Sequence, residues 1–309
     1  MNLDYKQIKA EFAKRFEQEC VPKLTEIENQ RKQVVLFSRI AKVLIVLADI
    51  VYFLIPGEHS IQWPVIITIL LFTGIALYKK AFVRKIKGFV MPQLCKCFGN
   101  LNWSTNGKVQ TGLFHMAGLI KDYNMETIDD IFRGKINDVH IEIDEVHLQK
   151  KEEVRHNGKT ETSYMTVFRG VFITLDMNKN FNGKTIIKPD TWSHLSPMAN
   201  LKHTTLEDVV FEKKYDVFTD DEIEARYLIT TSFMERLVNI KTAFKARRTS
   251  CAFYQDKLLI ALDTKKDLFE IRSINKPIYN IKQYDDMFDE IFSIINLIEH
   301  FKLNQKIGL

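Results

Sequence analysis

Two apolar blocks between Val43 and Tyr78 constrain this chain more than any other feature of its sequence. They flank a turn at residues 56–60, and no lysine or arginine occurs from Val43 to Tyr78. Basic residues crowd both ends instead, at positions 31, 32, 39 and 42 and again at 79, 80, 84, 85 and 87. An apolar hairpin with basic flanks is typical of two transmembrane helices whose outer ends face the cytoplasm.

The second block, Ile61 to Tyr78, nearly matches a hydrocarbon core of ~30 Å at ~1.5 Å per helical residue. The first block is interrupted by Asp49, and spanning requires Arg39 and Lys42 to extend their side chains to the lipid headgroups. The alternative is a buried or interfacial helical hairpin. We expect a multi-pass protein of the inner (plasma) membrane, with both termini cytoplasmic and Glu58–Gln62 outside.

Asp49 is an intramembrane polar residue if the first block spans. A charged carboxylate there costs about 2.5–3.5 kcal/mol, so its side chain should face protein. Thr68 or Thr73 of the second block could supply a hydroxyl, and so could a second copy of the hairpin in a homo-oligomer. A tolerated acid without a functional role is the alternative.

The basic excess is confined to this anchor. Residues 33–87 hold seven Lys and Arg against two Asp and Glu, whereas residues 88–309 hold thirty against thirty-one. The nearly neutral C-terminal part argues against a nucleic-acid partner. Anionic lipids near the basic flanks are the expected membrane partner, because each juxtamembrane Lys or Arg contributes roughly 1 kcal/mol near the surface.

The four cysteines are scattered, at positions 20, 95, 97 and 251. Cys95 and Cys97 have one residue between them, where zinc and redox motifs have two or more. Reduced thiols or juxtamembrane acylation at Cys95 and Cys97 are the remaining alternatives.

These patterns predict four segments: an amphipathic N-terminal helix over residues 1–33, a transmembrane hairpin over 34–78, a juxtamembrane helix over 79–100, and a cytoplasmic α+β domain over 101–309. Pro22 should kink or divide the N-terminal helix. The apolar stripes of the N-terminal and juxtamembrane helices should pack together as a stalk. The stripes comprise Ile8, Phe12, Phe16, Val21, Leu24 and Ile27 in the first, and Phe82, Ile86, Val90 and Leu94 in the second.

From about Leu101 the pattern changes to turns and short strands. A short helix is predicted at Met125–Phe132, before the first of the strands named below. The charged run Lys150–Ser163 includes Asn157-Gly158, which favours a type I′ turn at a solvated hairpin tip, with a specific binding loop as the alternative. A bulge is expected at Asp144–Glu145. The predicted strands are Val139–Leu148, Met165–Leu175, Thr185–Lys188, Val209–Phe218, Ala252–Tyr254, Lys257–Leu262 and Leu268–Ile271.

Two helices are predicted late in the chain, at Asp220–Ala246, broken around residues 230–232, and at Gln283–Leu303. The last helix should cap the sheet with an apolar face, and Glu290 on the neighbouring face should tolerate alanine. This order gives an α+β fold with a mixed sheet, and it resembles a pleckstrin-homology-like barrel. The apolar face comprises Tyr284, Phe288, Ile291, Ile295, Ile298 and Phe301.

Several motifs in the second half carry a family resemblance. They are Phe168-Arg169-Gly170-Val171-Phe172, Leu206-Glu207-Asp208, residues 211–217, residues 224–230 and residues 233–237. With its N-terminal helix, hydrophobic pair and C-terminal domain, nearly the whole chain resembles the bacterial membrane family catalogued as domain of unknown function 3137. Tyr215 stands where the pattern has Phe. The resemblance implies location and architecture, but no catalytic residue, because that family has no established activity.

No catalytic or cofactor motif is found. The glycines near Gly107-Lys108 have the wrong spacing for a phosphate loop, and Val109 replaces its Ser or Thr. The histidines at 140, 147, 194 and 203 do not cluster in sequence. We therefore expect no cofactor or metal site, and a protein without enzymatic activity is favoured.

The most suggestive polar set is a cluster of binding or structural ion-pair candidates: Glu212, Glu222, Glu224 and Arg226. Glu222 and Arg226 are four residues apart on a predicted helix and can pair. The set could fix the helix on the sheet, or form a site for a ligand or partner.

Three functional classes remain open. The first is a membrane-anchored cytoplasmic interaction or scaffold module for an unknown protein partner, which a flat apolar patch would favour. The second is a module that binds a lipid headgroup or small ligand, which a basic mouth near the bilayer would favour. The third is a membrane-tethered hydrolase, which a pocket of His, Asp and Glu would favour.

Overall fold

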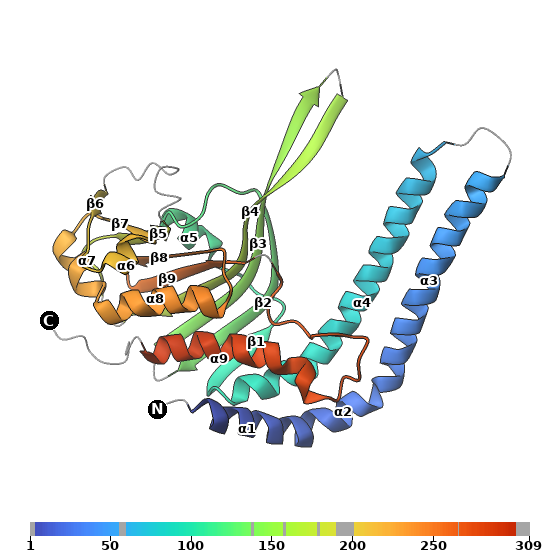
Figure 1. Cartoon of the computed structure of the whole chain (residues 1–309), viewed down its shortest axis with the longest axis horizontal. Helices are drawn as coiled ribbons and strands as arrows, with labels where there is room; N and C mark the ends of the chain where they lie inside the picture. Colours follow the sequence, from blue (N-terminus) through green and yellow to red (C-terminus); the bar gives the residue numbers. More distant parts are fainter. Residues whose placement is uncertain are drawn as a thin grey trace. The chain divides into compact units, whose positions relative to one another are not determined.

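The computed structural model of the chain describes residues 4–55, 60–136, 139–156, 159–177, 180–189, 201–264 and 266–300 (Figure 1). These residues form two compact units. The helical unit comprises residues 9–97 and 270–286, and the sheet unit comprises residues 98–269 with 4–8 and 287–300.

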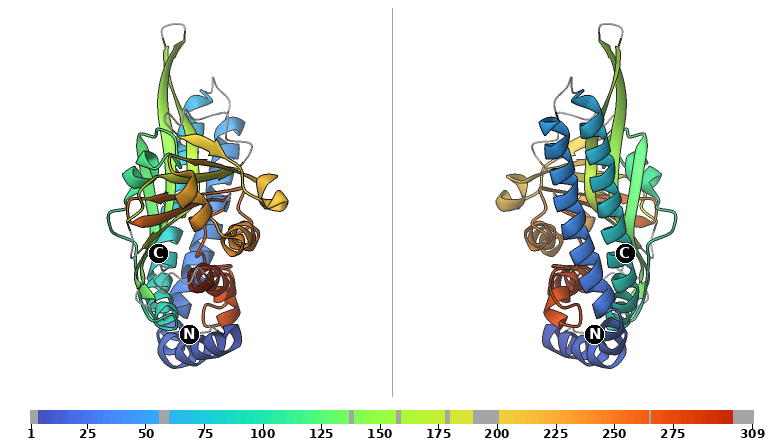
Figure 2. Two further views of the ribbon diagram at one scale, coloured as in Figure 1. Left: turned by 90° about the vertical axis from the view of Figure 1, so that its left-hand side faces the viewer. Right: turned by 90° about the vertical axis from the view of Figure 1, so that its right-hand side faces the viewer.

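The helical unit is a chain of helices separated by short breaks. α1 (Tyr5–Arg15) continues into a π-helical turn, η1 (Phe16–Cys20), and then into α2 (Val21–Glu26). α3 (Glu28–Leu54) and α4 (Gln62–Lys96) follow and lie side by side (Figures 1 and 2). The turn residues 56–59 lie outside the described part of the chain.

The π-helical turn η1 interrupts the regular N-terminal helix just before Pro22, although the backbone stays helical through it. Pro22 occupies the first turn of α2, where a missing backbone N–H breaks no intrahelical hydrogen bond. A second break at Ile27 precedes α3, so the helix that contains the first apolar block begins at Glu28 rather than after residue 33. Pro92 lies inside α4, which remains a single helix.

The predicted packing of the two apolar stripes is confirmed for η1 and α2. η1 and α2 contact α4, and the Cys20 thiol lies 3.5 Å from the Phe89 carbonyl oxygen. Val21 is half-buried and the other stripe residues are buried. Removing each of these apolar side chains from water stabilises the folded chain by roughly 1.5–3 kcal/mol, which explains why the stalk forms.

Residues 270–286 belong to the helical unit although they lie far along the chain. Arg31 forms a buried ion pair with Glu28 at 2.7 Å and donates from Nη1 to the Ile274 carbonyl at 2.9 Å. Glu28 also accepts from the Ile278 N–H at 3.4 Å. Charged side chains on α3 therefore hold this segment at Ile274 and Ile278.

The sheet unit contains a nine-stranded sheet among the described residues. Every pairing is antiparallel, so the predicted mixed sheet is wrong in strand direction. The strand order is linear, with later strands inserted between earlier ones, and this pairing is not that of a pleckstrin-homology-like barrel. In spatial order the strands are β1 (Asn100–Ser104), β2 (Met125–Ile136), β3 (Val139–His156), β4 (Lys159–Asp176), β9 (Lys257–Asp263), β8 (Arg248–Tyr254), β5 (Thr185–Pro189), β7 (Tyr215–Thr219) and β6 (Lys202–Thr204).

The helix predicted at Met125–Phe132 is wrong, because these residues begin strand β2. β2 pairs with both β1 and β3, and these ladders override the local helical signal. The pairing with β3 shifts between Ile128 and Ile131, so the irregularity predicted on β3 lies on β2, opposite Glu145. Within it, the buried Asp130 carboxylate accepts a hydrogen bond of 2.7 Å from the Trp103 indole.

Two other strand predictions are corrected. Val209–Phe218 divides into a short helix, α6 (Val209–Glu212), and strand β7, because the Asp208 carboxylate caps the helix by accepting from the Val210 and Phe211 N–H groups. Leu268–Ile271 is not a strand, since Phe269 has a φ of 55° and carboxylates hold this turn instead of a ladder.

The long β3–β4 hairpin is confirmed. Its last described pair is His156 with Lys159, and the predicted turn residues 157–158 lie outside the described part. From Lys150 onward β3 pairs only with β4 among the described strands, so this end is a two-stranded ribbon (Figure 1). The tight hairpin predicted between β8 and β9 is also present.

The late helices agree with prediction. The helix predicted at Asp220–Ala246 is broken into α7 (Glu222–Leu228) and α8 (Thr231–Ala243). The last helix is η3 (Ile281–Tyr284) followed by α9 (Asp285–His300), whose Ile291 and Ile295 are fully buried. The Ile298 side chain and residue 301 lie outside the described part.

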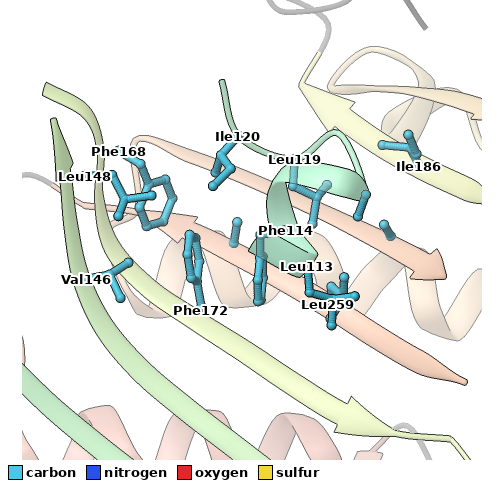
Figure 3. Close-up of a cluster of buried hydrophobic side chains, with 13 residues drawn as sticks. Leu113, Phe114, Leu119, Ile120, Val146, Leu148, Phe168, Phe172, Ile186 and Leu259 are labelled. Atoms are coloured by element: carbon cyan, nitrogen blue, oxygen red, sulfur yellow. The ribbon is translucent and has the colours of Figure 1, made fainter. Parts of the chain in front are cut away.

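The two faces of the sheet have separate apolar contacts. On one face, α5 (Thr111–Met116) and the loop after it bury a cluster in which Phe114 stacks on Phe172 at 3.9 Å (Figure 3). On the other face, the ring centroids of Phe233 on α8 and Phe253 on β8 are 5.2 Å apart. Alternation along the strands supplies apolar side chains to both faces, which gives an α+β domain.

Candidate functional site

The α3–α4 pair exposes many apolar side chains in its described residues between Leu36 and Tyr78. α4 is the one described helix long and apolar enough to cross a membrane, and 11% of its most apolar window is buried. Soluble monomers rarely expose apolar patches larger than a few hundred Å². Exposed members are Leu36, Phe37, Ile40, Val43, Leu44, Val46, Leu47, Ile50, Val51, Phe53, Leu54, Ile55, Ile61, Trp63, Val65, Ile66, Ile67, Ile69, Leu70, Leu71, Leu77 and Tyr78.

Asp49 faces the partner helix of this pair. The Thr68 hydroxyl donates to its Oδ2 at 2.8 Å, as expected. The other candidate donor, Thr73, instead donates to the Ile69 carbonyl in its own helix at 2.7 Å. The polar group in the first block is therefore satisfied inside the hairpin and does not interrupt its outer apolar surface.

A pocket of about 420 Å³ with several polar side chains in its lining lies beside α5 in the sheet unit. His115 Nε2 lies 2.7 Å from Asp122 Oδ1, and Tyr123 donates to Thr111, which donates to Glu126, each at 2.7 Å. The pocket is lined by Gly112, His115, Asp122, Tyr123, Asn124 and Glu126. No sequence motif signals it, because its residues come from a short helix, a loop and the start of β2.

The walls of this pocket are held by the sheet. Asn124 exchanges two hydrogen bonds with the backbone of Lys151 on β3, at 2.9 and 2.7 Å. Phe114 anchors α5 on the apolar cluster beneath (Figure 3). Two carboxylates, an imidazole and an aromatic ring suit recognition of a small polar ligand. Among the described residues no group of three His, Cys, Asp or Glu could hold a metal ion.

The predicted set of Glu212, Glu222, Glu224 and Arg226 is distributed between two helices. The buried Glu224 carboxylate accepts from the Asn182 and Gly183 N–H groups at 3.1 and 2.9 Å. Glu212 accepts from the Leu206 N–H at 2.7 Å.

Glu222 and Arg226 are both exposed, and they make no ion pair with each other in the described part of the chain. Asp221 caps their helix, α7, by accepting from the Ile223 and Glu224 N–H groups. Ile223 is 84% exposed on the same short helix.

The cysteines are buried and unoxidised in the described chain. Burial raises the pKa of the Cys97 thiol to about 12 and that of Cys20 to about 11. Thiols with such values are poor nucleophiles at neutral pH. Cys95, the other acylation candidate, is 1% exposed.

The histidines make separate contacts. His140 Nδ1 lies 3.6 Å from Asp176, His147 Nε2 lies 3.0 Å from the Thr166 hydroxyl, and His203 Nε2 lies 3.1 Å from Asp216. Burial, followed by Arg169, lowers the pKa of His147. His194 lies outside the described residues.

Comparisons with known proteins give limited matches. No curated protein matches the chain. One matching solved structure is that of the mycobacterial trehalose monomycolate transport factor A, with 11% identity and a TM-score of 0.37, covering 67% of this chain and 91% of that chain.

The family comparison is specific to the second half of the chain. Residues 166–303 match the family described as Protein of unknown function (DUF3137). This range contains all five motif runs on which the family resemblance rests, from residue 168 to residue 237. Residues 166–303 are therefore similar to the DUF3137 family.

Proposed function

We propose that α3 and α4 cross a membrane as a helical hairpin and anchor an interaction module at its surface. The observation that carries this proposal is the apolar surface exposed from Leu36 to Tyr78 on both helices. A lipid environment removes the cost of this exposure, roughly 25 cal/mol per Å² of apolar surface in water.

α3 carries too much charge to insert readily alone, but its charges are compatible with insertion beside α4. The Asp49 carboxylate is hydrogen-bonded to Thr68 within the pair. Arg39 and Lys42 lie towards the end that leads to Lys79 on α4, where long basic side chains can reach the headgroups. The pair therefore enters the membrane as a unit.

The basic flanks orient the hairpin with both termini in the cytoplasm of a cell with an inner (plasma) membrane. Anionic lipids surround the basic end, and Ser60, next to the turn, lies on the outer side. The chain is a multi-pass membrane protein in this proposal, and a second copy or another protein is its partner.

The cytoplasmic module binds a protein partner and acts as a scaffold. Exposed apolar side chains on α6 and α7, including Val209, Val210 and Ile223, support an interaction surface. Glu212 and Glu224 serve structurally, because each carboxylate holds a neighbouring backbone segment. The polar pocket at His115 supports a second candidate function, binding of a small polar ligand.

Carbonate extraction and cysteine labelling test the anchor. The native thiols are buried, so they should contribute little maleimide labelling beside a single introduced cysteine. Ser60→Cys should react with a membrane-impermeant maleimide in intact cells, whereas Ser163→Cys, on the exposed β4 ribbon, should react only after lysis. Release of the chain by carbonate refutes spanning, and labelling of Ser163→Cys in intact cells refutes the orientation.

A further inference from the structure

Three basic residues lie where the apolar surface of the α3–α4 pair ends. The rings of Phe37 and Tyr78 contact at 5.9 Å across the pair, which sets the register of the two helices. Arg39 and Lys42 follow Phe37 on α3, and Lys79 follows Tyr78 on α4. The three cations therefore lie at the same end of the hairpin.

These cations are not neutralised within the described chain. Arg39 donates from Nη2 to the Asn275 side-chain oxygen at 3.4 Å, a neutral partner. The Lys42 ammonium lies 5.7 Å from the Phe72 ring, and neither lysine forms an ion pair with a described residue. Partial burial lowers the pKa of Lys79, and the positive charges of Lys42 and Arg39 lower it further. The charges of Lys42 and Arg39 are therefore near enough to repel that of Lys79.

We propose that Arg39, Lys42 and Lys79 form a binding site for the phosphate of an anionic lipid headgroup. The inference rests on the proposed membrane hairpin, because at that depth the available anion is lipid phosphate. A phosphate would replace mutual repulsion by charge-assisted hydrogen bonds, with Arg39 as the fork-shaped donor. Free inorganic phosphate has the same chemistry but lacks the acyl chains that the apolar residues next to the site would contact.

The site can be tested with the full-length chain in detergent micelles. Native mass spectrometry would count phosphatidylglycerol and phosphatidylcholine molecules retained per chain during titration. The variant Arg39→Gln/Lys42→Gln/Lys79→Gln should lose roughly a hundredfold in phosphatidylglycerol affinity, since each cation near the surface contributes about fivefold. The matched control Lys32→Gln/Arg84→Gln/Lys85→Gln removes the same charge from exposed positions further from the apolar surface.

We expect the first triple variant to lose phosphatidylglycerol binding selectively, while phosphatidylcholine retention stays unchanged. Inorganic phosphate at roughly 10 mM should displace phosphatidylglycerol only weakly, because it lacks the acyl chains. Equal losses in the two triple variants would overturn the site, because nonspecific attraction would then explain binding. Full competition by inorganic phosphate would overturn the assignment to lipid. Binding in micelles is independent of carbonate extraction, so failure of the membrane hairpin and failure of this site are distinguishable.

Discussion

The hydroxyl of Thr68 on α4 donates a 2.8 Å hydrogen bond to the carboxylate of Asp49 on α3. This bond joins the two helices within their apolar part, whereas Lys85 of α4 donates to the Gln30 side chain of α3 nearer the other end of the pair. Because a carboxylate in an apolar environment needs a donor, the pair specifies both the rotation and the register of the helices.

Replacing Thr68 with valine should destabilise the full chain in detergent by about 1 kcal/mol, because Asp49 loses its donor. Thr73→Val is the matched control, since that hydroxyl bonds within its own helix, and it should change stability by a few tenths of a kcal/mol. Thermal unfolding followed by circular dichroism measures both. Adding Asp49→Leu should remove most of the Thr68→Val cost, whereas fully additive effects would show that the bond is not formed.

Replacing Ile291 with aspartate should unfold the sheet unit in the full chain. The side chain is fully buried in α9, and an unpaired buried carboxylate costs several kcal/mol of a total stability of about 5–15 kcal/mol. Ser293→Ala is the control on the same helix, because its hydroxyl donates to the Asp289 carbonyl of that helix. Similar melting temperatures for these two variants would mean that α9 is not part of the core.

Glu290→Ala should not be silent, in contrast to the expectation from periodicity. Its carboxylate accepts from the Phe269 N–H at 2.6 Å and from Lys266 at 3.0 Å, and so holds the turn in which Phe269 has positive φ. Loss of the acceptor should cost about 1–3 kcal/mol. Urea unfolding of the full chain measures this cost, and a midpoint equal to that of the unsubstituted protein would contradict it.

Asp144 should make stability fall as the pH rises. Burial raises the pKa of its carboxyl to about 7, although Arg133 lies 2.6 Å away and opposes the shift. In the unfolded chain the value is about 3.9, so between pH 4 and pH 7 the folded state binds more protons and loses stability with increasing pH. As the pH rises from 4 to 7, the unfolding free energy of the wild type should therefore fall by about a few kcal/mol relative to that of Asp144→Asn.

The matched control for this titration is Asp256→Asn, at a half-exposed turn position. The Asp256 side chain is 48% exposed, so the two variants compare the loss of an exposed carboxylate with the loss of a buried one. The same pH dependence of unfolding free energy for both variants would show that the Asp144 carboxylate is solvated in the folded protein.

Arg31→Leu should destabilise the helical unit by about 3–5 kcal/mol, because Glu28 would remain as a buried unpaired charge and Ile274 would lose its donor. Arg15→Leu breaks the pair with Glu11 on the exposed surface and should cost less than about 0.5 kcal/mol. Chemical denaturation of the full chain compares them, and equal midpoints would mean that the Arg31 network contributes nothing.

The sequence by itself determined the elements whose signal is local. Local periodicity or turn chemistry over a short stretch predicts the apolar blocks, the interruption near Pro22, the stalk stripes and the long charged hairpin. The motifs from residue 168 onward predict the similarity to DUF3137 found over residues 166–303. The Asp49–Thr68 contact could also be anticipated, because a lone acid among apolar residues has few donors within reach.

Only the tertiary structure decided features that depend on distant residues. Met125–Phe132 is a strand because β1 and β3 pair with it, Glu290 is needed because Phe269 presents an N–H, and residues 270–286 join the helical unit through Glu28 and Arg31. The pocket at His115 likewise needs a helix, a loop and a strand together. Local propensities differ by at most about 1 kcal/mol per residue, so a sheet ladder or a buried charge with its partner outweighs them.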